Sequence, residues 1–110
     1  MGCKIKWISK RTIKIIGVSE IKETSYSVMF DRIEAGTYLV ADTLLSKKII
    51  IKNVNPKVLK FETDLLKKMG AKIKNSKDSI FISKSNKLKS INISTKPYPG
   101  FPTDLQAQFM

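Results

Sequence analysis

The chain has 110 residues, with 21 Lys and Arg against 9 Asp and Glu, no His and a single Cys. This length suits one domain or a piece of one, and a 42% hydrophobic content is that of a globular protein. One Cys without His excludes an internal disulfide, a Cys/His zinc site and a His-dependent triad. The longest aliphatic cluster, 49–51, is far below the roughly 18 residues of a membrane span, and the early lysines interrupt any signal-peptide core. We therefore expect a soluble protein of a reducing compartment.

The formal net charge of +12 raises the question of nucleic-acid binding. Of the 21 basic residues, 19 are Lys, which spread along the chain without forming a block of five like charges. Recognition of phosphates and bases usually favours Arg, whose planar fork binds with two hydrogen bonds. Because 15 Ile accompany the lysines, both excesses fit an AT-rich coding sequence. We attribute the charge to composition and expect no nucleic-acid partner.

Apolar and polar residues alternate near the N-terminus, at 3–8 and again at 12–16. This period of two predicts a pair of half-buried strands joined by a tight turn. A loop is expected from Gly17 to about Ser25, followed by a short extended piece at 26–29.

Asp31 is expected to open a helix, with Glu34 three residues later in a variant of the capping box. Lys47 and Lys48 suit the C-terminal end of that helix dipole. The residues spaced for its apolar face are Ile33, Tyr38, Leu39, Ala41, Leu44 and Leu45.

The aliphatic run 48–53 predicts a buried strand, and the next helix is expected to start at Asn55 as cap and Pro56 in the first turn. Gly70 is expected to end that helix as its C-terminal cap. The apolar stripe of this helix is Val58, Phe61, Leu65 and Met69.

Three further strands are predicted at 71–75, 79–83 and 89–94, separated by turn residues. The proline-rich stretch 97–102 predicts a rigid loop, after which Thr103 is a candidate cap for a last helix.

An internal repeat underlies this layout. Residues 1–6 (MGCKIK) reappear as 69–74 (MGAKIK), and 12–15 (TIKI) are echoed by 79–82 (SIFI), at offsets of 68 and 67. So long a period predicts repeated strand–helix modules and an α/β fold. The chain opens at what is a helix end in the second copy and closes shortly after a helix start, so we expect a fragment.

Three places are candidates for chemistry. Cys3 has no His to activate it, and its counterpart in the repeat is Ala71, so we expect it to be structural. Capping explains Asp31 and Glu34 but leaves Arg32 for an interface or a substrate.

The segment 97–108 is the third and most informative candidate. Its stiff loop delivers Asp104 to a helix start, where a carboxylate can act as a general base towards a hydroxyl. An equally weighted alternative is that Thr103 and Asp104 serve only as first-turn residues that suit the helix dipole.

Four strings resemble the UDP-N-acetylglucosamine 1-carboxyvinyltransferase family of enolpyruvyl transferases, over essentially the whole chain. They are DRIEAGTYLVA (31–41), NVNP (53–56), LLKKMGAKI (65–73) and PYPGFPTDLQAQFM (97–110). Members of that family are several times longer. The resemblance implies an inside-out α/β barrel of repeated strand–helix modules in two domains. Residues 1–29 would then be the end of one domain and 30–110 the start of the other, truncated at its C-terminal end.

The resemblance implies transfer of enolpyruvyl from phosphoenolpyruvate to the 3-hydroxyl of UDP-N-acetylglucosamine, the cytoplasmic first step of peptidoglycan synthesis, without metal or cofactor. Asp104 would contact that hydroxyl and act as its base, Thr103 and Pro102 would shape the same wall, and Arg32 would bind substrate. Cys3 does not match the family's reactive Cys. Since other substrate ligands lie outside these residues, we expect the 110-residue piece alone to be inactive.

Asp31, Arg32 and Glu34 match a family helix start near the domain crossover, which implies cleft-lining or hinge roles. Two departures stand beside it: Phe30 replaces a usual Pro, and Asp42 falls in a normally small, apolar stretch, which is tolerable if Asp42 is exposed. The alternatives are a fragment of the shikimate-pathway enolpyruvyl transferase, a decayed and inactive reading frame, and a basic nucleic-acid-binding module.

Overall fold

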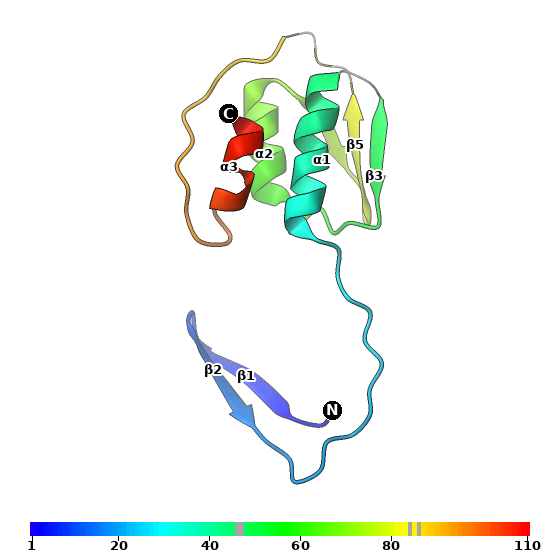
Figure 1. Cartoon of the computed structure of the whole chain (residues 1–110), viewed down its shortest axis with the longest axis vertical. Coiled ribbons are helices and arrows are strands. Elements are labelled where there is room, and N and C mark those ends of the chain that lie inside the picture. Colours follow the sequence, from blue (N-terminus) through cyan, green and yellow to red (C-terminus); the bar gives the residue numbers. More distant parts are fainter. Residues whose placement is uncertain (46–47, 84, 86) are drawn as a thin grey trace.

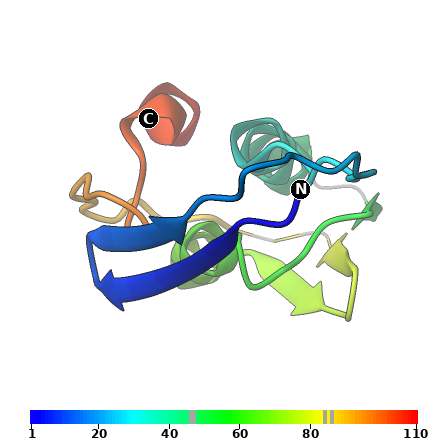
Figure 2. The same ribbon diagram turned by 90° about the horizontal axis from the view of Figure 1, so that it is seen from below.

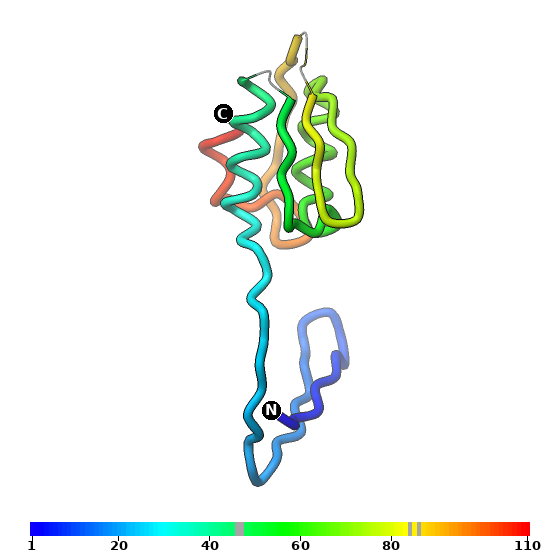
Figure 3. Tube along the Cα trace, turned by 90° about the vertical axis from the view of Figure 1, so that its right-hand side faces the viewer, coloured from blue at the N-terminus to red at the C-terminus, as the bar shows by residue number. Residues whose placement is uncertain are grey.

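The chain divides into a small hairpin and a larger α/β body (Figure 1), in a computed structural model that describes residues 1–45, 48–83, 85 and 87–110. The molecule measures 59 × 28 × 20 Å, and its radius of gyration is 17.7 Å. A compact domain of this length has a radius of gyration of about 13 Å. The excess arises from the stretch 17–31, which contains no helix or strand and leads from the hairpin to the body (Figure 3).

The hairpin consists of β1 (Lys4–Ser9) and β2 (Thr12–Ile16), paired antiparallel as predicted. The expected burial of one face is wrong, because every residue of both strands is exposed. Ile5 and Trp7 lie opposite Ile15 and Ile13, so the alternation does gather apolar side chains on one face. Within the described residues no other helix or strand packs on that face. The predicted extended piece at 26–29 pairs with no strand.

Helix α1 (Arg32–Leu45) begins where predicted, because Asp31 Oδ1 accepts hydrogen bonds from the amides of Ile33 (2.7 Å) and Glu34 (3.2 Å). The predicted apolar face is confirmed at Leu39 and in part at Ile33, which is half-buried against a core cluster, but Tyr38, Leu44 and Leu45 are exposed and Ala41 is only half-buried. Several small or polar residues define the face that is buried instead. These are Ala35, Gly36, Leu39, Val40, Asp42 and Thr43.

Strand β3 (Ile49–Lys52) and helix α2 (Lys60–Met69) follow. Strand β3 was expected to be buried, but it lies at an edge of its sheet and is only half-buried. Asn55 Oδ1 accepts the amide of Lys57 at 3.0 Å, so it caps a turn, and α2 starts later than predicted. Gly70 ends α2 with a left-handed φ of 108°, as expected. Of the two predicted C-terminal lysines of α1, Lys47 lies outside the described residues.

Strands β4 (Lys72–Asn75) and β5 (Ser79–Ser83) confirm two of the three predicted strands. With β3 they form an antiparallel sheet of order β3-β5-β4, and the helices lie on one side of it (Figure 2). The predicted strand 89–94 is wrong. Ile91 and Ile93 pack instead against the cluster around Phe101. The alternation of apolar residues at 89–94 therefore reflects partial burial and not pairing with a strand.

The chain ends in the short helices η1 (Thr103–Leu105) and α3 (Gln106–Phe109). The predicted helix start is confirmed, but Pro102 takes the cap position and Thr103 is the first residue of η1. Two core clusters hold the body together. One fills the space between the sheet, α1 and α2, and the other gathers Leu65, Phe101 and Leu105.

The internal repeat is present in the backbone. Gly2 and Gly70 both have positive φ, at 94° and 108°, and each precedes an antiparallel hairpin. The pair Ile5–Ile15 of the first hairpin corresponds to Ile73–Ile82 of the second, at the offsets seen in the sequence. The first hairpin carries one more residue, which forms a bulge between Trp7 and Ser9, and this explains why the offset falls from 68 to 67.

Candidate functional site

The proline-rich loop 97–102 is folded into a tight turn. Its Gly100 amide donates to the Pro97 carbonyl at 2.8 Å, and the Lys96 amide donates to the Phe101 carbonyl at 2.8 Å. A Cβ on Gly100 would lie 2.6 Å from Lys96 Cβ, so this approach needs glycine. The predicted loop is confirmed, and its two backbone hydrogen bonds close it into a turn, whereas its rigidity stays a prediction.

The loop and η1 are fastened to the body on either side of Asp104. Phe101 is buried and meets the ring of Phe109 edge-on, with 4.9 Å between ring centroids. Leu105 is also buried and lies against α1 at Gly36, where an added Cβ would come within 2.7 Å of Leu105 Cδ1. The glycine that lowers the helix propensity of α1 is therefore what admits η1.

Asp104 and Thr103 are exposed between these two buried residues, and Pro102 is half-buried beside them. Thr103 Oγ1 lies 3.5 Å from Asp104 Oδ1, at the limit of a hydrogen bond. The structure thus brings Pro102, Thr103 and Asp104 together on one short, fixed element. An exposed carboxylate held in this way is able to accept a proton from a hydroxyl placed against it.

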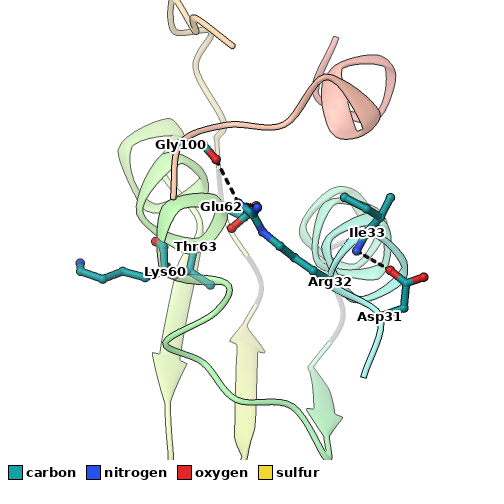
Figure 4. A network of polar contacts seen from close by, with 7 residues as sticks. All are labelled: Asp31, Arg32, Ile33, Lys60, Glu62, Thr63 and Gly100. Carbon is teal, nitrogen blue, oxygen red and sulfur yellow. Dashed lines mark hydrogen bonds and ion pairs between the residues drawn. The ribbon is translucent and has the colours of Figure 1, made fainter. Parts of the chain in front are cut away.

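Arg32 reaches the same loop from the first residue of α1 (Figure 4). Its Nη2 lies 2.6 Å from Glu62 Oε1 on α2 and donates to the carbonyl oxygen of Gly100 at 3.0 Å. The guanidinium carbon also lies 4.9 Å from the centre of the Tyr98 ring, in a cation–π arrangement. We call these four residues the Arg32 network.

Sequence reasoning missed Glu62, whose side chain is 0% exposed. A signal was present, because Leu59, Glu62 and Leu66 follow a spacing of three and four residues and share the buried face of α2. The predicted stripe is confirmed at Leu65, which is buried, and at Phe61 and Met69, which pack against the core clusters, but it omitted the neighbouring positions that include Glu62. Glu62, a charged residue at a position where this spacing predicts an apolar one, indicated a buried carboxylate.

The other predicted candidates lie apart from this site. Cys3 is exposed at the start of the hairpin, and Glu34 is exposed on α1. Thr37 Oγ1 lies 3.1 Å from the side-chain amide of Gln108, which joins α3 to α1. In the ranges that the structure describes, no cluster of three or more His, Cys, Asp or Glu could hold a metal ion.

The condition under which Asp42 would be tolerated, exposure to solvent, is not met, because only 7% of the residue is accessible. It lies on the packed face of α1, and desolvation raises the pKa of its carboxyl above the ordinary value of 3.8. The burial follows from the rotated helix face described above. Asp42 is therefore a local cost to folding at neutral pH.

A pocket of about 530 Å³ opens between α1, α2 and α3. Its lining is mainly aliphatic and aromatic, including Leu66, Ile91 and Phe109, and it contains neither Asp104 nor Arg32. A lining of this kind suits apolar groups and offers little to a phosphate-bearing substrate. The pocket therefore lies apart from the candidate residues of the loop and η1.

Comparison with known proteins places this chain in a known class. It belongs to the EPSP synthase (3-phosphoshikimate 1-carboxyvinyltransferase) family, whose model matches residues 1–110. It is 56% identical over 110 residues to the UDP-N-acetylglucosamine 1-carboxyvinyltransferase of Pelagibacter ubique (strain HTCC1062). The proteins of that name from Orientia tsutsugamushi (strain Ikeda) and Halothermothrix orenii are 48% and 44% identical over 111 and 110 residues.

Each of these three matches covers 100% of this chain but only 26% of the relative. The chain thus spans about a quarter of the length of the curated relatives it matches. The resemblance drawn from the sequence strings is confirmed, and the names favour the UDP-N-acetylglucosamine enzyme over the shikimate alternative. Among the helices in the described ranges, none is long and apolar enough to cross a membrane.

Proposed function

We propose that this chain forms part of an enzyme that transfers enolpyruvyl from phosphoenolpyruvate to the 3-hydroxyl of UDP-N-acetylglucosamine. The observation that carries the proposal is the 56% identity over the whole chain to a transferase of that name. The geometry supports it, because Asp104 is exposed on an element held by buried residues on both sides. The proposed setting is peptidoglycan synthesis in the cytoplasm.

In this proposal Asp104 takes the proton of the sugar hydroxyl as its oxygen bonds to C2 of phosphoenolpyruvate. Over the whole reaction the C2–O bond to phosphate breaks, and inorganic phosphate leaves with a proton. A positioned carboxylate contributes typically 10²–10⁴-fold to such a step. Pro102 and Thr103 form the adjoining wall of the substrate site. Contact of Arg32 with substrate stays a prediction.

The proposal extends to domain organisation. Residues 1–29 would belong to one domain of an inside-out α/β barrel enzyme and 30–110 to the start of the other. Support comes from the absence of packing between the hairpin and the body within the described residues. The repeated hairpin with its left-handed glycine supports a fold built from repeated modules.

The test is Asp104→Asn in the full-length protein that carries this chain. We expect kcat to fall by roughly 10²–10⁴-fold while KM for both substrates changes by less than about threefold, because the amide keeps the shape but accepts no proton. Steady-state phosphate release, measured with UDP-N-acetylglucosamine and with shikimate 3-phosphate, gives both the rate and the substrate preference.

The matched control is Asp64→Asn, an exposed aspartate on α2 that pairs with Lys60 at 2.5 Å. It should leave both constants unchanged. Unchanged turnover in Asp104→Asn contradicts the base role, and a preference for shikimate 3-phosphate contradicts the proposed substrate.

A further inference from the structure

The Arg32 network contains a buried ion pair that the stability of the fold does not require. Glu62 is wholly buried, and a buried carboxylate is costly unless it is paired. The pair with Arg32 leaves Glu62 Oε2 and Arg32 Nε without a hydrogen bond among the described residues. Apolar side chains in place of such a pair are often neutral or stabilising. Its presence therefore points to a role other than holding α1 to α2.

The position of the loop is what the network determines. The same Nη2 atom that meets Glu62 also meets the Gly100 carbonyl, so one guanidinium links α1, α2 and the loop (Figure 4). Tyr98 lies over the guanidinium face and adds a second contact to the loop. Glu62 fixes the direction of the guanidinium, and the guanidinium fixes Gly100.

Asp104 lies four residues after Gly100, and the segment between them has little freedom. Phe101 is buried and Leu105 is lodged at Gly36, so a shift of the turn at Gly100 is passed on to η1. A displacement of about 1 Å at a catalytic group costs up to 10²-fold in rate. Small changes at Arg32 should therefore be visible in turnover.

We propose that Arg32, oriented by buried Glu62, is a positioning residue that sets the loop 97–102 and thereby the carboxylate of Asp104. The inference rests on the proposed function for its effect on catalysis, but its effect on the loop stands apart from it. Arg32 here acts through Asp104 and needs no contact with substrate.

The first experiment replaces the pair with apolar residues, Arg32→Met with Glu62→Leu, in the full-length protein. Since no buried charge remains unpaired, we expect the melting temperature to be equal or higher. We also expect kcat to fall roughly tenfold to hundredfold, with KM for both substrates within about threefold. The matched control, Lys60→Met with Asp64→Leu, removes an exposed ion pair from the same helix and should leave kcat unchanged.

A double-mutant cycle then separates positioning from other roles. In an Asp104→Asn background the Arg32/Glu62 replacement should lower kcat by less than about twofold, because no base remains to be positioned. A full additive loss overturns the inference. So does a large rise in KM with unchanged kcat, which would assign Arg32 to direct substrate contact.

The last experiment is independent of activity and uses the 110-residue chain. Hydrogen exchange at the Lys96 and Gly100 amides, which close the turn, should speed up about tenfold in the apolar pair variant. The Thr63 amide, which donates to the carbonyl of Leu59 at the start of α2, should not change. Unchanged exchange at both turn amides overturns the inference. If Asp104→Asn keeps turnover, the base role fails, and exchange alone decides whether Arg32 holds the loop.

Discussion

The two hairpins of this chain have the same pattern but opposite environments. Each follows a glycine with positive φ, and equivalent residues face each other across each strand pair. Exposed fractions are 62%, 45% and 63% at Ile5, Ile13 and Ile15, against 7%, 0% and 2% at Ile73, Ile80 and Ile82. The difference comes from α1 and α2, which cover β5 and β4, whereas no described element covers β1 and β2.

This comparison shows that alternation of apolar and polar residues predicts which face of a hairpin is apolar, but does not predict whether that face is buried. A two-stranded hairpin by itself is only marginally stable in water. The second hairpin gains its stability from the helices packed on it, and the first displays the same surface without a partner. Under the proposed domain organisation, the elements that would cover the first hairpin belong to the domain of which residues 1–29 are the end.

The largest expected contrast is between Ile80→Ala and Ile13→Ala, which occupy equivalent positions. Ile80→Ala should lower the free energy of unfolding by about 2–5 kcal/mol, because it leaves a cavity in the packed core. Ile13→Ala should change it by less than about 0.5 kcal/mol, because its side chain already meets water. Urea denaturation of the 110-residue chain, followed by circular dichroism, measures both values.

The same pair of substitutions tests whether the first hairpin is covered in a longer protein. In that protein Ile13→Ala should become about as costly as Ile80→Ala. A cost that stays near zero there would contradict the assignment of 1–29 to a packed domain.

A smaller contrast is expected between Gly70→Ala and Gly2→Ala. Both replace a glycine with positive φ, a strain of about 1–3 kcal/mol. At Gly70 the new Cβ also comes within 2.9 Å of the Lys87 carbonyl oxygen, whereas at Gly2 its nearest neighbour is Val18 at 3.7 Å. We therefore expect Gly70→Ala to cost about 2–3 kcal/mol in urea denaturation and Gly2→Ala less than 1, because the bare hairpin frays to relieve the strain. Equal losses would show that the hairpin folds together with the body.

The smallest expected effect concerns the burial of Asp42 on α1, which lowers the stability of the packed α/β body at neutral pH. Burial raises the pKa of Asp42, so the native state binds its proton more tightly than the unfolded state does. The contribution of Asp42 is therefore most favourable below pH 3.8 and is lost as pH rises through the raised native pKa. Asp42→Asn should raise the free energy of unfolding at pH 7 by roughly 1 kcal/mol and have little effect near pH 3.

Thermal denaturation across that range measures the difference. Asp64→Asn is the matched control, because it makes the same substitution at a carboxylate that is exposed and paired with Lys60. A gain from Asp42→Asn that is equal at both pH values would contradict desolvation as the cause.

Most elements were predictable from local signals. The Asp31 cap, the Gly70 stop and the alternation at 71–75 and 79–83 act over a few residues, and the structure confirms them. The buried face of α1 was not predictable in this way. Its packing depends on Leu105, about 70 residues away, which demands Gly36 where an apolar pattern would favour a larger side chain. The strand expected at 89–94 failed because pairing needs a partner that local pattern does not reveal.

The candidate site was predictable in part. The prolines and Gly100 indicated a stiff loop that presents Asp104, and the geometry confirms that loop. Arg32 was noticed because capping left it without a role, but its partners come from two distant elements. Glu62 was missed because a charged residue is normally assigned to the solvent side of a helix.

The bulge in β1 has a consequence for aligning the two halves of this sequence. Without a gap, Lys14 of the first half would align with Ile82, which is almost fully buried. A gap of one residue at the bulge between Trp7 and Ser9 restores Ile15 to Ile82 and Ile13 to Ile80. Because side chains alternate along a strand, a gap at any other position in β1 or β2 would exchange the two faces for the residues between that gap and the bulge. An alignment of the two modules of this chain therefore requires the gap at the bulge, and the strand pairing rather than residue identity fixes that position.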